Sequence, residues 1–248
     1  QDALWDNGLP WRRQSWRVTA QGNYGKAKTG MKPKLIIGNK NYSSWSLRAW
    51  FLLREADIDF DEHRIVLDTD DTAREIAEFS PAGRVPILLL DGIAVWDTLA
   101  IAETVAERWP GKRLWPEDAT ARAHARSVSA EMHSGFDELR SRMPMNCRAM
   151  GRRVALPDEL TSDIDRIIDI WSDCHRRYGD SGPWLFGEFS IADAMYAPVV
   201  LRLRTYGINL PESAGYYPQR VLQSEAMQEW LLACETEIEV IGHEEVGQ

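Results

Sequence analysis

The stretch GRVPILLLDGIAVWDT, residues 83–98, contains the strongest indications of the fold. Two short apolar runs flank Asp91-Gly92, a dipeptide that favours a tight β-hairpin. Pro86 stands at the entry to the first run, where a proline is tolerated because it need not donate to the sheet. Asp97-Thr98 follows the second run, and both residue types commonly cap helices. The stretch therefore predicts an antiparallel hairpin that leads into a helix.

The segments on both sides extend this pattern. Apolar runs and helical periodicity predict strands at 35–37, 60–67, 86–90 and 93–95 and helices at 46–56, 72–79 and 98–109. After Pro110-Gly111 the periodicity is almost entirely helical, with helices expected at 119–142, 158–178, 190–204 and 224–241. We therefore expect an α/β domain over residues 31–111, a linker, and an all-α domain over residues 118–248.

The first 30 residues differ from the rest of the chain. They contain Trp5, Trp11 and Trp16 but no apolar periodicity and no apolar core of a signal peptide. Met31 directly precedes the first strand, so we interpret it as the natural start. Residues 1–30 are then an extension or a cloning artefact, and we expect them to be disordered.

Composition argues against several classes of partner. The net charge is −9, and binding to nucleic acid or to an anionic membrane surface depends on clustered Lys and Arg. The cysteines, Cys147, Cys174 and Cys234, are odd in number and widely spaced, which fits neither a disulfide framework nor a zinc site. We expect no metal, no nucleic acid and no membrane, and a reducing, cytoplasmic location.

The loop before the first predicted helix, residues 41–46, has the sequence NYSSWS. The N–H groups and the dipole at a helix N-terminus stabilise an anion, and a thiolate is an anion. A hydroxyl of Ser43 or Ser44 could donate a further hydrogen bond to it. The alternative is that these serines only cap the helix.

Two other segments suit a peptide-like ligand. A cis bond between Val85 and Pro86 would turn the polar groups of Val85 outward to pair with an extended ligand, whereas a trans bond would only mark the strand start. Asp97-Thr98 could hold an amino-acid end-group, with Asp97 taking the ammonium and Thr98 the carboxylate. Capping of the helix is compatible with that role.

Residues 190–193, SIAD, have capping-box spacing, which we interpret as structural.

Together these segments resemble the cytosolic glutathione S-transferase superfamily from Met31 to about Val240. Residues 42–48, YSSWSLR, resemble the S-S-x-S stretch of serine-type, zeta-like members. Val85-Pro86 stands where the family has a cis-proline, and Asp97-Thr98 where many members have Glu-Ser. The resemblance implies a thioredoxin-like glutathione-binding domain followed by an all-α helical domain, and a homodimer.

The resemblance also implies an activity. Glutathione would be the co-substrate, and its thiol would attack a small hydrophobic electrophile, as in detoxification. Ser43 stands at the catalytic position with Ser44 beside it, and the expected glutathione-binding residues are Trp45, Arg84, Val85, Pro86, Asp97 and Thr98. The electrophile pocket should lie against the helix expected at 119–142, and the candidates for it are His133, Phe136, Arg140 and Met143.

Two alternatives stay open. One is a binding module with this fold and no catalysis. The other is a glutathione-dependent isomerase. Trp45 occupies the position of a cysteine in zeta-type members, which argues against a maleylacetoacetate isomerase, and the lack of cysteine before Cys147 argues against disulfide exchange.

Overall fold

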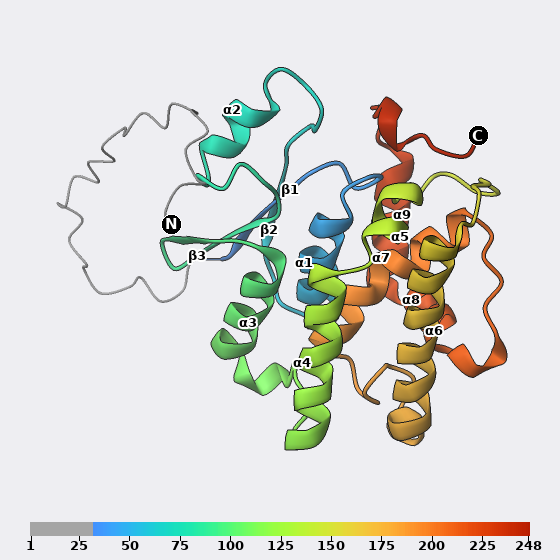
Figure 1. Cartoon of the computed structure of the whole chain (residues 1–248). Coiled ribbons are helices and arrows are strands. Elements are labelled where there is room, and N and C mark those ends of the chain that lie inside the picture. The colour runs from blue at the N-terminus through green and yellow to red at the C-terminus, as the bar shows by residue number, and fades with distance from the viewer. Residues whose placement is uncertain (1–31) are drawn as a thin grey trace, which may run out of the picture.

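The computed structural model describes residues 32–248 (Figure 1). The extension expected at residues 1–30 lies outside the described residues. None of the helices within residues 32–248 combines the length and the apolar character needed to cross a membrane.

The first part of the described chain is built on a mixed four-stranded sheet. Its strands are β1 (Lys34–Ile37), β2 (Asp61–Arg64), β3 (Ile87–Leu90) and β4 (Ile93–Val95). The order is β2-β1-β3-β4, with β1 parallel to β2 and antiparallel to β3. Strands β3 and β4 form the hairpin predicted around Asp91-Gly92. This sheet and its helices confirm the thioredoxin-like domain.

Three helices cover the two faces of this sheet: α1 (Ser44–Glu55), α2 (Thr72–Ala77) and α3 (Thr98–Arg108). Successive side chains of a strand point to opposite faces. Leu35 and Ile37 of β1 accordingly join the large core that includes α1 and α3, whereas Ile36 packs with Ile76 of α2 in a small separate cluster. The first residue of α1, Ser44, contacts Arg202 in the second half of the chain.

The second domain is entirely helical. Its helices are α4 (Ala119–Ser134), α5 (Asp137–Arg142), α6 (Asp158–Tyr178), α7 (Ile191–Thr205), α8 (Tyr217–Gln223) and α9 (Glu225–Glu235), with short 3₁₀ turns at Pro110–Lys112, Gly179–Ser181, Glu212–Ala214 and Gly242–Glu244. Helix α7 is buried almost all round and packs against α1 and α4. Figure 1 shows the sheet and the first three helices as one half of the molecule and these helices as the other.

Two helices expected for this domain were wrong in detail, and one helix was missed. The helix expected over 119–142 is interrupted, because Phe136 adopts a left-handed backbone (φ 60°) while its ring is buried. The helix expected over 224–241 ends at Glu235, since the following residues turn toward the first domain. Helix α8 was missed. In the first domain the strand expected over 60–67 is shorter, from Asp61 to Arg64.

Candidate functional site

Two cavities meet at the beginning of α1. The larger encloses about 810 Å³ and the smaller about 490 Å³. Both are lined by Trp45, Arg84, Val85 and Arg140, so these residues form the wall between them. One cavity system therefore spans the two domains, with Arg140 from α5 and the other three residues from the first domain.

The smaller cavity lies against the hairpin and the start of α3. The Val85–Pro86 bond is cis, as predicted, and Val85 precedes the first paired residue of β3. Asp97 is the N-cap of α3, and its Oδ1 accepts hydrogen bonds from the backbone N–H groups of Leu99 (3.2 Å) and Ala100 (3.4 Å). The other oxygen of Asp97, Oδ2, lies 3.2 Å from Nε2 of His133. The carboxylate that caps the start of α3 thus also faces this cavity.

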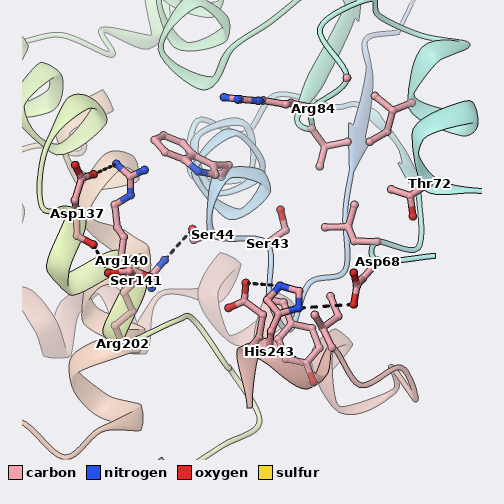
Figure 2. Close-up of a pocket in the computed structure, with 18 residues that line it drawn as sticks. Ser43, Ser44, Asp68, Thr72, Arg84, Asp137, Arg140, Ser141, Arg202 and His243 are labelled. Carbon is pink, nitrogen blue, oxygen red and sulfur yellow. Dashed lines mark hydrogen bonds and ion pairs between the residues drawn. The ribbon is translucent and has the colours of Figure 1, made fainter. Parts of the chain in front are cut away.

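The larger cavity contains both serines of the loop before α1 (Figure 2). Ser43 is the N-cap of α1: its Oγ accepts from the Ser46 backbone N–H (3.3 Å) and donates to Ser46 Oγ (2.8 Å). Ser44 behaves differently, because its Oγ accepts a hydrogen bond from Nη2 of Arg202 (3.1 Å). Capping and a place in the cavity therefore coincide at Ser43, while Ser44 is coupled to the second domain.

Two guanidinium groups lie over the ring of Trp45. The guanidinium carbon of Arg48 is 4.3 Å from the ring centroid and that of Arg140 is 5.1 Å away. Arg48 is fully buried, and its Nε donates to the Met195 carbonyl (2.8 Å). Burial lowers the pKa of Arg48, and the charges of Arg202 and Arg140 lower it further. The potential around Trp45 is therefore strongly positive.

Residues near the C-terminal end of the described chain also line the larger cavity. His243 lines it, with Nδ1 3.7 Å from Oδ2 of Asp68 and Nε2 3.8 Å from Oε1 of Glu244 (Figure 2). Burial raises the pKa of Glu244, and the nearby charge of Arg202 opposes that rise. Further along the chain, Glu245 Oε1 accepts a hydrogen bond from the Tyr42 hydroxyl (2.7 Å). The C-terminal segment thus contacts the loop that carries both serines.

The structure brings the expected catalytic and glutathione-binding residues to the two cavities. The larger cavity contains Ser43, Ser44, Trp45, Arg84 and Val85, and the smaller contains Trp45, Arg84, Val85, Pro86, Asp97 and Thr98. Of the residues proposed for the electrophile pocket, His133 and Arg140 line a cavity. Phe136 and Met143 belong to the buried core.

Sequence reasoning missed further cavity-lining side chains, namely Leu67, Asp68, Thr72, Ile76, Ala82, Trp96, Asp137, Ser141, Arg202, Ile241, His243 and Glu244. Most come from the end of the chain, from α5 and α7, or from the segment before α2. Helix α7 is uncharged apart from Asp193, Arg202 and Arg204, and these few charges are the one local signal. Charged residues are rarely buried without a specific partner, so the two arginines could have been singled out, but the sequence does not separate Arg202 from Arg204.

The three cysteines lie away from both cavities. Cys147, Cys174 and Cys234 are buried. Burial raises the pKa of Cys174 to about 12, so its thiol is protonated at neutral pH. Within residues 32–248, neither cavity is lined by a cysteine thiol.

Comparison with known proteins identifies the family. Residues 42–108 match the glutathione S-transferase N-terminal domain, and residues 117–231 match the C-terminal domain of the same family. A maleylacetoacetate isomerase of Rattus norvegicus is 27% identical over 185 residues, which cover 72% of this chain and 82% of the rat protein. A probable maleylacetoacetate isomerase of Caenorhabditis elegans is 31% identical over 111 residues, or 45% of this chain and 51% of the nematode protein.

A solved structure shares the fold. It is a glutathione transferase homolog from Burkholderia with bound glutathione, 23% identical, with a TM-score of 0.63 over 84% of this chain and 100% of that one. Both domain models of the family match this chain. The order of its helices and strands and the cis Val85–Pro86 bond agree with that assignment. This chain therefore belongs to the glutathione S-transferase family.

Proposed function

We propose that this chain binds glutathione across the two cavities and activates its thiol for attack on an electrophilic carbon. The observation that carries the proposal is the shared wall of Trp45, Arg84 and Val85. On one side of it lies the carboxylate of Asp97, and on the other lies the serine loop at the start of α1. A tripeptide that passes Val85 would have its amino-acid end at Asp97 and its sulfur at the serines.

Each part of glutathione has a partner in this arrangement. Asp97 would take the ammonium of the γ-glutamyl group, and Thr98 with the N-terminus of α3 would take its carboxylate. The polar backbone groups of Val85 would pair with the peptide as in an added strand. Arg84 is exposed at the rim of both cavities, where it could meet the carboxylate at the other end of the tripeptide.

The chemical task is to ionise the thiol. A free thiol has a pKa of about 8.5 and is mostly protonated at neutral pH. A serine hydroxyl, the first N–H groups of α1 and the positive charge around Trp45 all favour the thiolate. The sulfur then forms a bond to the electrophilic carbon, the leaving group departs with its bonding electrons, and the thiol proton passes to solvent.

The larger cavity has room for a small second substrate beside the sulfur. Leu67, Ile76 and Ile241 offer apolar surface, while Arg140 and Arg202 stand on the opposite wall. We propose a small electrophile with a hydrophobic body and a polar group directed toward these arginines. A homodimer, a cytoplasmic location and a role in detoxification, which the family resemblance implies, belong to the same proposal.

Turnover of a nitro-substituted aryl chloride with glutathione tests the transferase activity. Release of chloride together with loss of free thiol supports it. Binding of glutathione, measured by calorimetry, without turnover of any aryl halide, isothiocyanate or cis-alkene would support the binding module instead.

The identity to the rat maleylacetoacetate isomerase favours one second candidate, a glutathione-dependent isomerase. In that reaction the thiolate adds to a conjugated alkene and leaves again after rotation about the former double bond. Isomerisation of a cis-alkene conjugated to a carbonyl, with glutathione unchanged in amount, distinguishes it from transfer.

A further inference from the structure

Three guanidinium groups lie at Trp45 or Ser44, those of Arg48, Arg140 and Arg202, and within residues 32–248 two of them have no carboxylate partner. Arg140 lies 3.6 Å from the exposed carboxylate of Asp137. Among the ion pairs within residues 32–248, none involves Arg48 or Arg202, although both side chains are buried. Buried charges are normally paired, and Arg202 lines the larger cavity, so its unpaired charge indicates that an anion binds there.

Arg202 is the cation that reaches the serine loop directly. Its Nη1 donates to the carbonyl oxygens of Arg140 (3.2 Å) and Met143, at the end of α5. Its Nη2 is thereby held toward Ser44 Oγ, at 3.1 Å. Figure 2 shows this pair on the side of the cavity opposite to Asp68 and Thr72. The guanidinium therefore fixes the position of the Ser44 hydroxyl from the second domain.

The two serines differ in the freedom of their protons. Ser43 Oγ donates its proton to Ser46 Oγ, and Ser46 Oγ in turn accepts from the Gly38 N–H (3.0 Å). The Ser44 oxygen accepts from a cation, and its own proton has no acceptor among the hydrogen bonds of the described chain. A hydroxyl that accepts a charge-assisted hydrogen bond is polarised and becomes a stronger donor.

We propose that Ser44, and not Ser43, donates the hydrogen bond that stabilises the glutathione thiolate, and that Arg202 is the positioning residue for its hydroxyl. The S-S-x-S resemblance predicts Ser43 for that role, whereas the hydrogen bonds commit Ser43 to capping α1. The inference rests on the proposed function, because it needs a thiolate bound in the larger cavity. It also makes thiol activation depend on contact between the two domains.

The test is the pKa of enzyme-bound glutathione, measured from the ultraviolet absorbance of the thiolate as a function of pH. We compare the wild type with Ser43→Ala, Ser44→Ala, Arg202→Lys and the double variant Ser44→Ala/Arg202→Lys. Arg202→Lys keeps the charge but loses the fixed fork geometry of the guanidinium. Arg204→Lys, on the same helix but outside both cavities, is the matched control. Urea unfolding of each variant verifies that it is folded.

Ser44→Ala is expected to raise the pKa of bound glutathione by about 1–2 units, and Arg202→Lys by a smaller amount. The double variant should equal Ser44→Ala alone, because Arg202 acts through that hydroxyl. Arg204→Lys and Ser43→Ala should leave the thiol pKa where it is, while Ser43→Ala lowers the urea midpoint through the lost cap.

Two results overturn the inference and leave the proposed function standing. One is a shift in Ser43→Ala without a shift in Ser44→Ala. The other is full additivity in the double variant, which would mean that Arg202 acts on the sulfur or on the second substrate directly. If the wild type binds glutathione with the thiol pKa of free glutathione, the proposed function itself fails. The wild-type titration therefore separates the two failures.

Discussion

The carboxylate of Asp97 lies 3.2 Å from the imidazole of His133, which joins the start of α3 to the last turn of α4. The same carboxylate caps α3 through its other oxygen. Both contacts leave 59% of the Asp97 side chain exposed, and Asp97 lines the smaller cavity. Asp97 thus caps α3, contacts the second domain through His133, and is the residue proposed to bind the ammonium group.

Replacing Asp97 with Asn separates these roles. Asn caps helices about as well as Asp, so the fold should persist while the negative charge is lost. We expect the KM for glutathione to rise about 3–10-fold, with kcat at saturation nearly unchanged, because the contact exists in ground and transition states alike. Steady-state kinetics with varied glutathione measures this.

Asp91→Asn is the control for that experiment. Asp91 lies in the β3–β4 turn, pairs with Arg108 and lines neither cavity. Its KM for glutathione should equal that of the wild type. A wild-type KM in Asp97→Asn would refute the placement of the ammonium.

Asp193 belongs to the capping box at the start of α7, in the interior of the second domain. It is completely buried, with Oδ1 accepting from the Leu185 N–H (2.9 Å) and Oδ2 from the N–H (2.8 Å) and Oγ (2.9 Å) of Ser190. This geometry confirms the capping box predicted at residues 190–193. Asp193→Ala should lower the free energy of unfolding by about 2–4 kcal/mol, because it leaves buried donors without acceptors. Urea unfolding measures the loss, with the exposed Asp165→Ala as control.

The stability contributed by Asp193 should depend on pH. Burial raises its pKa to about 7 from the ordinary 3.8, so between these values the folded protein holds a proton that the unfolded chain has lost. Stability falls with rising pH wherever the folded state binds more protons. The difference in unfolding free energy between wild type and Asp193→Ala should therefore be larger at about pH 5 than at about pH 8. A difference that grows with pH would contradict this.

Local signals explain why so much of the first domain could be predicted. The Asp91-Gly92 turn, the proline at Pro86 and the cap at Asp97 each depend on a few neighbouring residues, and the structure has each of them where expected. The predicted caps also indicated where the candidate site lies. Helix starts and strand ends meet there, and they bring Ser43, Val85 and Asp97 to the two cavities.

Contacts between distant parts of the chain were beyond such reasoning. Arg202 and Ser44 are 158 positions apart, and nothing in either segment indicates the other. The break at Phe136 has the same origin: the apolar period continues through it, and packing of the buried ring imposes the left-handed backbone. Tertiary contacts determine such features, and local periodicity does not report them.

The burial of all three cysteines leads to a chemical expectation. Replacing Cys147, Cys174 and Cys234 together by Ala should leave kcat/KM for conjugation unchanged, since none of them lines a cavity. The cost should appear in stability, at about 1 kcal/mol for each site.

Thiol labelling gives an independent measurement on the wild type. A chromogenic disulfide reagent should react slowly with the native protein and rapidly after unfolding in urea, because burial keeps the reagent away from the three thiols. Fast labelling of one cysteine in the native protein, with loss of turnover, would contradict the serine-type assignment.

The last expectation concerns Glu237, which ties the C-terminal segment to the loop that carries the serines. Its Oε1 accepts from the Lys40 backbone N–H (2.7 Å) and its Oε2 from the Asn41 backbone N–H (3.0 Å), in a buried position. In Glu237→Gln one of these N–H groups faces an amide NH₂ and loses its acceptor. We expect a loss of about 2–4 kcal/mol in unfolding free energy.

The same substitution should loosen the loop itself. Backbone hydrogen exchange at Lys40 and Asn41 is expected to speed up more than exchange in α6, because local opening requires only the loss of these contacts. Glu239→Gln is the matched control, since Glu239 pairs with Arg64 and does not hold the loop backbone. Its loss should stay below about 1 kcal/mol, in the range of partly exposed ion pairs. Equal losses of unfolding free energy in the two variants would show that the negative charge of the C-terminal segment stabilises the protein, and not a specific contact of Glu237. Unchanged exchange at Lys40 and Asn41 in Glu237→Gln would show that the Glu237 carboxylate does not anchor the loop.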